Sequence, residues 1–334
     1  MTRAPERVPD PTREWATLPT SRAPRWFLPR RRGTATRRSF MIYHPVTLRS
    51  RVGWEAARRL AAVGALELLR PSNMLPREVW EPVAGVIPQG GALAVARANH
   101  PGRFLALVVG ADGDLLAFLK VARDSVGSDV LERERRALET YGPLLPPPLF
   151  TPRVLDGQAG SLLLEAIEWR SRAIPWGLPT DVAHAMGRFY AASVSEGSQG
   201  VTQGDFTPWN LLRAPHGWAL VDWESAESGV PPFFDLFHFF VQSSAELRRP
   251  SKRAVIEGLD LRGWVGACVE AYSAGAGVDP RAAKDLFGEY LRFSAARVSA
   301  GAPPRARRIR RELAARLGAV RTGAPQPDAA GGGP

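Results

Sequence analysis

Apolar and turn-forming residues alternate in the first half of the chain in the way that favours strands. Ala92–Ala98, Phe104–Val109 and Leu115–Ala122 are short, mostly apolar segments of the length typical of strands. The two connections, Asn99–Arg103 and Gly110–Asp114, contain the Gly, Pro, Asn and Asp residues that tight turns favour. The pattern predicts an antiparallel meander of three strands.

The periodicity changes from strand-like to helix-like after residue 179. Before that point we expect one helix at 128–141 and short strands at 154–155 and 162–167. Beyond it, apolar residues recur at helical spacing in five segments, 180–197, 233–246, 253–275, 280–299 and 304–321. A β-rich part followed by a helical part predicts an α+β fold with two lobes. The smaller, antiparallel lobe would span residues 90–168, and the larger, mostly helical lobe residues 169–321.

The two ends of the chain lack this regularity. Residues 1–38 are rich in Arg, Pro, Thr and Ser without apolar periodicity, so we expect a mostly extended or disordered tail. Residues 39–89 are expected to form an N-terminal extension in which Val52–Leu69 is an amphipathic helix. Within it, Ser39–Val46 fits either a strand or an extension of the lobe. The Gly-, Pro- and Ala-rich residues 322–334 predict a second disordered tail.

The net charge of +11 lies mostly near the two ends. Residues 1–70 hold 15 arginines against 5 acidic residues, and residues 301–334 hold 7 against 2. Residues 71–250 hold 15 basic residues against 20 acidic ones. No interleaving of aromatic and basic residues and no zinc-finger spacing indicates specific nucleic-acid binding. The arginine-rich ends offer contact with a protein, a membrane surface or another polyanion.

The cellular setting is indicated by cysteine usage and by the lack of long apolar segments. The single cysteine, Cys268, can form neither an internal disulfide nor a thiolate metal site by itself. We find no run of 18 or more uncharged apolar residues, and Pro and Arg interrupt the first 25 residues. We therefore expect a cytoplasmic protein without a transmembrane segment.

Three polar residues near the middle of the chain have the types and spacing that phosphoryl transfer requires. Such transfer needs a carboxylate beside the attacking hydroxyl and oxygen ligands for magnesium on the nucleotide phosphates. Asp205 is followed five residues later by Asn210, and Asp222 comes after the next apolar segment. The apolar pairs Leu211-Leu212 and Leu220-Val221 flank a turn, so Asn210 and Asp222 are expected at the same end of a hairpin. Their side chains could then share one metal ion.

The stretches GDFTPWN and VDWESAESGVPPFFDL resemble the motif pair of the aminoglycoside phosphotransferase and choline kinase superfamily. The resemblance extends over about residues 90–300 and implies a protein-kinase-like fold, with ATP as donor and Mg²⁺ as the metal. By position, Asp205 matches the catalytic base, Asn210 and Asp222 match the metal ligands, and Asp235 matches the acid that braces the loop. Gln203 stands where the family usually has a histidine that supports this loop.

Lysine usage gives a separate indication of nucleotide binding. The chain has only three lysines, and one of them, Lys120, lies in an apolar predicted strand. An ammonium group is a compact charge that suits nucleotide phosphates, and this position resembles the nucleotide-binding lysine of kinases. The expected partner is a helix carboxylate, with Glu134 as first choice and Glu132 as second.

The remaining nucleotide contacts are predicted from the order of the elements. Gly102 is the one glycine in the turn that would cover the phosphates, where kinases often place several. The backbone of Glu165 and Ile167, in the segment joining the lobes, would pair with the adenine. His238 is interpreted as a core or supporting histidine rather than a catalytic one, and Cys268 as a core residue.

The acceptor and an alternative role complete the hypotheses. Enzymes that hold polycationic aminoglycosides line the acceptor pocket with carboxylates, whereas the last predicted helix carries several arginines. This favours a neutral or anionic hydroxyl compound, such as a sugar, an amino alcohol or a phosphorylated metabolite.

The alternative is a nucleotide-binding pseudokinase or scaffold with arginine-rich interaction tails, motivated by Gln203 and the glycine-poor turn. Nucleic-acid binding as the main role is a third and weaker hypothesis.

Overall fold

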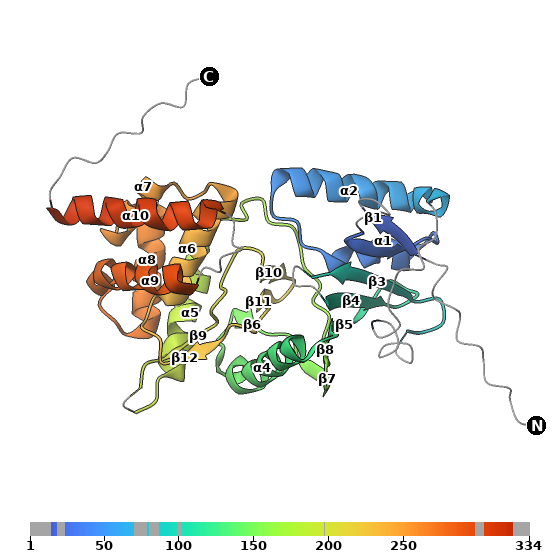
Figure 1. Ribbon diagram of the computed structural model, residues 1–334, viewed down its shortest axis with the longest axis horizontal. Helices are drawn as coiled ribbons and strands as arrows, with labels where there is room; N and C mark the ends of the chain where they lie inside the picture. The colour runs from blue at the N-terminus through green and yellow to red at the C-terminus, as the bar shows by residue number, and fades with distance from the viewer. Residues whose placement is uncertain are drawn as a thin grey trace, which may run out of the picture. The chain divides into compact units, whose positions relative to one another are not determined.

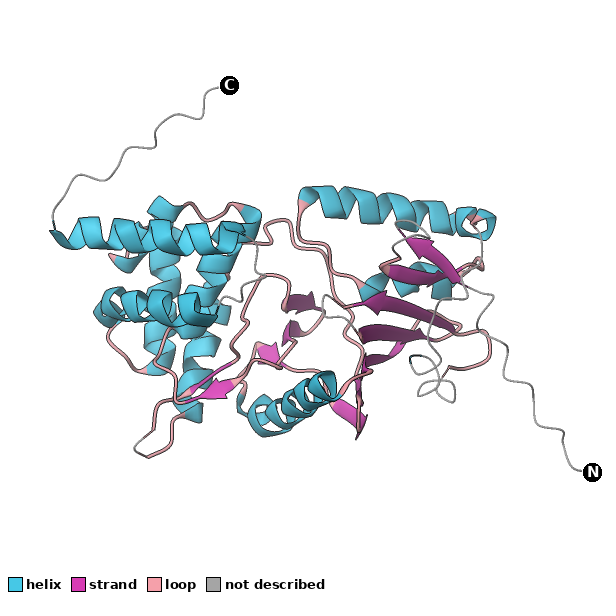
Figure 2. Cartoon of the chain, viewed as in Figure 1, coloured by secondary structure: helices cyan, strands magenta, loops and turns pink. Residues whose placement is uncertain are grey.

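The chain forms two compact units in the computed structural model, which describes residues 15–18, 24–69, 79, 87–98, 102–196, 198–297 and 304–322. The β-rich unit comprises residues 1–139 and 152–171, and the helical unit comprises residues 140–151 and 172–334. The prediction of an α+β fold with a β-rich and a helical part is confirmed (Figure 2). Among the described residues, no helix has both the length and the apolar character needed to cross a membrane.

The β-rich unit is built on an antiparallel sheet with the strand order β1-β2-β3-β4-β5-β8-β7 (Figure 1). Its strands are β1 (Trp15–Leu18), β2 (Trp26–Pro29), β3 (Ala92–Arg97), β4 (Arg103–Val109), β5 (Leu115–Ala122), β7 (Val154–Gln158) and β8 (Ser161–Leu164). Strand β4 pairs with β3 on one side and with β5 on the other, so the predicted three-stranded meander is confirmed.

Both faces of this sheet are apolar. Neighbouring residues point to opposite sides of a strand, and apolar residues occupy both kinds of position. Phe27 and Val95 pack in one core cluster, whereas Leu28 and Ala94 pack in the other. The second cluster also contains Trp54 from α2 (Leu48–Ala62), and further residues from α1 (Thr34–Ser39) and the short helix η2 (Phe40–Ile42). These helical segments therefore cover one face of the sheet.

The N-terminal region differs from the prediction. The expectation of a tail without regular structure over residues 1–38 is wrong for β1, β2 and α1, and residues 1–14 lie outside the described residues. The Arg- and Pro-rich composition of this region led to the wrong prediction, because it surrounds two four-residue strands whose apolar residues are buried. Phe27 is fully buried and pairs in register with Val95 of β3, and the Trp15 indole donates to the Leu93 carbonyl at 2.9 Å.

The proposed extension at residues 39–89 also belongs to the β-rich unit. Ser39–Val46 forms no strand, since its first residues end α1 and form η2. The predicted helix begins at Leu48, earlier than expected, because the Thr47 side chain accepts a hydrogen bond from the Ser50 N–H at 3.1 Å and caps it. It ends at Ala62 and is followed by η3 (Ala65–Leu68). Residues 323–334, which make up nearly all of the predicted C-terminal tail, lie outside the described residues.

The helical unit contains most of the predicted helices and three short strand pairings. Its helices are α5 (Thr180–Ser193), α6 (Phe234–Leu247), α7 (Lys252–Leu259), α8 (Gly263–Ala276), α9 (Ala283–Arg297) and α10 (Pro304–Thr322). Its strands are β6 (Leu149–Phe150), β9 (Val201–Thr202), β10 (Leu211–Ala214), β11 (Gly217–Leu220) and β12 (Glu227–Ser228). Helix α4 (Ser125–Tyr141) begins in the β-rich unit and ends where the helical unit begins.

One predicted helix, 253–275, is two helices in the structure. Leu261, which lies between α7 and α8, and Gly263, the first residue of α8, both have left-handed backbone angles, with φ of 59° and 63°, and the chain changes direction there. Cys268 lies on α8 and is fully buried, as the interpretation as a core residue predicts. Burial raises the pKa of its thiol to about 12, so it is a packing residue at neutral pH.

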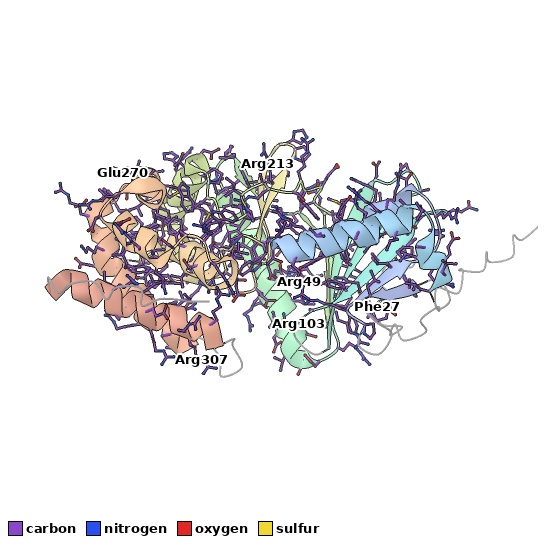
Figure 3. All side chains as sticks on the ribbon, turned by 90° about the horizontal axis from the view of Figure 1, so that it is seen from above. Phe27, Arg49, Arg103, Arg213, Glu270 and Arg307 are labelled. Carbon is purple, nitrogen blue, oxygen red and sulfur yellow. The ribbon has the colours of Figure 1, made fainter. Side chains whose placement is uncertain are left out.

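We predict that Phe27→Ala lowers the free energy of unfolding by about 3–5 kcal/mol, because it leaves a cavity in the core of the β-rich unit. Phe27, labelled in Figure 3, has no exposed surface. Chemical denaturation measures the change, with Val52→Ala on α2 as control, since Val52 is 63% exposed and its loss should cost less than about 0.5 kcal/mol. An equal midpoint for Phe27→Ala and the wild type would mean that β2 is not part of the folded sheet.

Candidate active site

The loop that follows β9 is fixed by one buried carboxylate. Asp235, in the first turn of α6, accepts hydrogen bonds from the Thr202 hydroxyl, from the Gln203 N–H at 2.8 Å and from the Gly204 N–H at 3.0 Å. Burial raises the pKa of this carboxyl, and the three hydrogen bonds act in the opposite direction. Asp235 thus braces the loop in the way that the motif resemblance implies.

Gly204 occupies a position that other residues cannot adopt without strain. Its φ is 84°, and a Cβ atom there would lie 2.0 Å from the Ser225 carbonyl oxygen. The close approach brings the loop against the chain just beyond Asp222. The Gly-Asp pair of the motif is therefore explained by backbone geometry.

Gln203 links the same loop to the segment that contains Asp222. Its side-chain Nε2 donates to the carbonyls of Val221 at 3.1 Å and Asp222 at 2.6 Å, while its Oε1 accepts from the Asp205 N–H at 3.0 Å. The side chain is fully buried. An imidazole has one donor and one acceptor in its neutral form, so the Gln203 amide can replace both functions of a histidine.

Asp205 projects from this loop with a defined orientation and with access to solvent. Its side chain is 33% exposed. Asn210 Nδ2 donates to the Asp205 side-chain Oδ2 at 2.8 Å and to its carbonyl at 3.0 Å. Because Asn210 uses its nitrogen for Asp205, its Oδ1 is the atom that would coordinate a cation.

Asn210 and Asp222 lie at the same end of a hairpin, as predicted. In the β10–β11 ladder Leu211 pairs with Leu220, and the Val221 N–H donates to the Asn210 carbonyl at 3.0 Å. Asp222 follows directly and has a left-handed backbone, with φ of 64°. An amide oxygen and a carboxylate are the hard oxygen ligands that magnesium prefers, so the donor set fits this metal.

His238 contacts Asp205, a connection that the sequence analysis did not identify. His238 Nε2 lies 3.1 Å from Asp205 Oδ1 and 3.3 Å from Gln242 Nε2, and His238 Nδ1 lies 3.2 Å from the Tyr290 hydroxyl. Burial raises the pKa of Tyr290 to about 12, so its hydroxyl is protonated at neutral pH and can donate to Nδ1. In the tautomer whose Nδ1 accepts from Tyr290, Nε2 carries the ring proton and donates to Asp205 Oδ1, and Gln242 Nε2 forms no hydrogen bond with that nitrogen.

A spacing signal for His238 was present in the sequence. Asp235 and His238 are three residues apart on α6 and therefore lie on the same side of the helix, where both contact the loop of Asp205. The sequence alone left open whether His238 is a core histidine or a supporting one. Tyr290, from α9, gave no such signal, because nothing in a single sequence places a tyrosine 52 residues away beside this histidine.

In the β-rich unit, Lys120 and Glu134 form the predicted contact. Lys120 Nζ, from β5, lies 2.7 Å from both carboxylate oxygens of Glu134 on α4. The two side chains are 12% and 1% exposed. The second choice, Glu132, instead accepts hydrogen bonds from Arg135 and Arg136 at 2.7 Å. The role of the pair in nucleotide binding stays a prediction.

The backbone groups of Gly102 and Glu165, two of the other predicted nucleotide contacts, take part in hydrogen bonds within the protein. Gly102 has a φ of 82° in the turn before β4, and its carbonyl accepts from the Arg123 N–H at 3.0 Å. The Glu165 N–H donates to the Arg153 carbonyl at 2.9 Å, so this N–H is already used within the protein. Ile167 is partly buried in the same segment. Residues 99–101 of the turn lie outside the described residues.

No family model matches the chain, and no curated protein shows significant sequence similarity to it. Solved structures that resemble it include macrolide 2'-phosphotransferase MphH from Brachybacterium faecium, with 16% identity, coverage of 71% of this chain and 96% of that one, and a TM-score of 0.43. Amicoumacin kinase hAmiN matches with 12% identity, coverage of 72% and 94%, and a TM-score of 0.44. A putative fructosamine-3-kinase from Thermobifida fusca matches with 16% identity, coverage of 68% and 93%, and a TM-score of 0.42. Likeness at this level assigns no activity to the chain.

We predict that Lys120→Met lowers the free energy of unfolding by about 3–5 kcal/mol, because it leaves the buried Glu134 carboxylate without the ammonium group. The double variant Lys120→Met/Glu134→Leu should recover most of the loss, since it removes both charges from the interior. Urea denaturation of the wild type and the two variants measures the difference. A single variant as stable as the wild type would show that the pair is not buried.

We predict that Gln203→Leu lowers the free energy of unfolding by about 1–3 kcal/mol, because the Asp205 N–H and the Val221 and Asp222 carbonyls each lose a hydrogen bond from a buried position. Gln203→His supplies one donor and one acceptor, and should lose less. Thermal unfolding of the three proteins tests the order. A leucine variant more stable than the histidine variant would contradict the bridging role of the amide.

Proposed function

We propose that the chain is a small-molecule kinase that transfers the γ-phosphoryl group of ATP to a hydroxyl group. The observation that carries the proposal is the arrangement of Asp205, Asn210 and Asp222. The partly exposed Asp205 carboxylate accepts a hydrogen bond from the Asn210 amide, and Asn210 and Asp222 lie at the same end of a hairpin. This is the set of groups that phosphoryl transfer uses. The motif resemblance assigns the same roles, within a protein-kinase-like fold.

Each residue has a defined task in the proposed reaction. The Asp205 carboxylate accepts the proton of the acceptor hydroxyl as the new O–P bond forms and the bond between the γ-phosphorus and the bridging oxygen breaks. His238 and Asn210 hold that carboxylate through its two oxygens. Asn210 and Asp222 would hold magnesium, which neutralises charge on the phosphates when it is bound. Lys120, fixed by Glu134, would contact the phosphates of the nucleotide.

The acceptor is proposed to be neutral or anionic. The last helix, α10, carries seven arginines and one acidic residue within Pro304–Thr322. The positive charge of this helix disfavours the approach of a polycationic aminoglycoside to the helical unit and does not oppose neutral or anionic hydroxyl compounds. The scaffold alternative rested on Gln203 and on the glycine-poor turn. The hydrogen bonds of the Gln203 side chain supply the loop support that a histidine would give.

We predict that Asp205→Asn abolishes acceptor-dependent ATP consumption while retaining nucleotide binding, because it removes the proton acceptor and keeps the shape of the side chain. Acceptors are first found by thermal shift across a metabolite panel with Mg²⁺ and a nonhydrolysable ATP analogue. Turnover with each hit is then compared between wild type and variant.

Glu270→Gln serves as the matched control, since Glu270 is an exposed carboxylate on α8 in the same unit (Figure 3). We expect the control to turn over at the wild-type rate. Equal acceptor-dependent turnover in the wild type and Asp205→Asn would rule out Asp205 as the base. Equal background rates in both proteins, with no acceptor-dependent turnover, would favour the scaffold. Activity confined to cationic aminoglycosides would overturn the proposed acceptor class.

A further inference from the structure

A groove of about 670 Å³ lies between α9 and α10 in the helical unit. Four arginines line it, Arg292 from α9 and Arg307, Arg310 and Arg311 from α10. The rest of its described lining consists of glycine, alanine and leucine, and none of it is acidic. The volume is that of a typical small-molecule pocket.

The concentration of positive charge is the unusual feature of this groove. Like charges around one cavity repel one another, and the repulsion is relieved when an anion binds among them. The one acidic residue of α10, Glu312, is already engaged, because its carboxylate lies 2.6 Å from Lys252 Nζ and 3.7 Å from Arg308 Nε. It therefore does not balance the arginines of the groove.

Arg310 gives the groove a fixed inner wall. The side chain is only 5% exposed, its Nε donates to the Ser294 hydroxyl at 3.0 Å and its Nη1 donates to the Ala306 carbonyl at 3.0 Å. Arg292, Arg307 and Arg311 are exposed around it, and Arg307 is labelled on α10 in Figure 3. A guanidinium held in place beside exposed ones favours binding of planar or tetrahedral oxyanions.

The groove is separate from the proposed transfer site. Tyr290 lies close to Arg310. Burial raises the pKa of the Tyr290 hydroxyl, and the smaller effect of the Arg310 charge lowers it. That hydroxyl contacts His238, which in turn contacts Asp205. Neither Tyr290 nor His238 lines the groove, so two side chains stand between its wall and the catalytic carboxylate.

We propose that this groove is a second binding site, for a small organic anion that carries a phosphate or carboxylate group. The arginines bind the anionic group, and Leu291 and Leu317 contact an apolar part of the ligand. A side chain at Gly288 would extend toward the groove lining, because a Cβ atom there would lie 3.5 Å from Leu317 Cδ2 and 3.9 Å from Arg292 Nη1. The site requires neither ATP nor metal, so it stands independently of the proposed kinase activity.

Isothermal titration calorimetry of the full chain without nucleotide tests the site, with phenyl phosphate and benzoate as anionic probes and benzyl alcohol as the neutral one. We expect at least one anion to bind and the alcohol to give no heat. The double substitution Arg292→Gln/Arg311→Gln should weaken binding at least about tenfold, since it removes two charged hydrogen-bond donors. Comparison of the two anions identifies the preferred anionic group.

Two further variants keep the result interpretable. Arg308→Gln removes one exposed arginine of α10 that does not line the groove, and should bind as the wild type does. Gly288→Leu changes no charge but fills the groove, and should abolish binding. The proposal is overturned if neither anion binds, if the double variant binds as tightly as the wild type, or if Arg308→Gln loses as much. It is also overturned if a single-stranded oligonucleotide binds more tightly than either probe and Arg308→Gln weakens that binding equally, which would indicate a general polyanion surface.

Discussion

The buried carboxylate of Asp235 is the contact on which the loop of Asp205 depends. Removing a carboxylate from water is costly, and three donors from one short segment, the Thr202 hydroxyl and the N–H groups of Gln203 and Gly204, compensate for it. The same hydrogen bonds hold the backbone where Gly204 has a left-handed conformation. Asp205 is the next residue, so its position depends on hydrogen bonds to Asp235 that Asp205 itself does not form.

Gln203 and Asn210 connect this loop to the groups that we propose take part in the reaction. Gln203 ties the loop to the Val221–Asp222 backbone, and Asn210 ties the Asp205 side chain to the start of the β10–β11 hairpin. The proposed base and both proposed metal ligands are consequently linked by hydrogen bonds before any ligand binds. Phosphoryl transfer depends on such preorganisation, because positioning and charge neutralisation supply most of the rate enhancement.

The sequence predicted the elements whose signals are local. The meander at residues 92–122 followed from apolar segments and turn residues, the Lys120–Glu134 contact from a rare lysine near a helix carboxylate, and the Asn210–Asp222 arrangement from a hairpin. Each needs only residues that are close in sequence or that belong to a recognisable motif.

The features that were missed depend on contacts between distant segments. Strand β2 is too short to have a periodicity, and it is a strand because Phe27 and Leu28 are buried on opposite faces of the sheet beside β3. The break at Leu261 comes from a left-handed backbone at a residue type that rarely adopts one. The contact of His238 with Asp205 needed the tertiary placement of α6 against the loop.

Amide hydrogen exchange at Gln203 and Gly204 is the most direct measurement of the central claim, that Asp235 holds the loop of Asp205. Both amides should be strongly protected in the wild type and should exchange much faster in Asp235→Ala, while Leu107 in the β-rich sheet keeps its protection in both proteins. Rapid exchange of these two amides in the wild type, or equal protection in the wild type and the variant, would contradict the account.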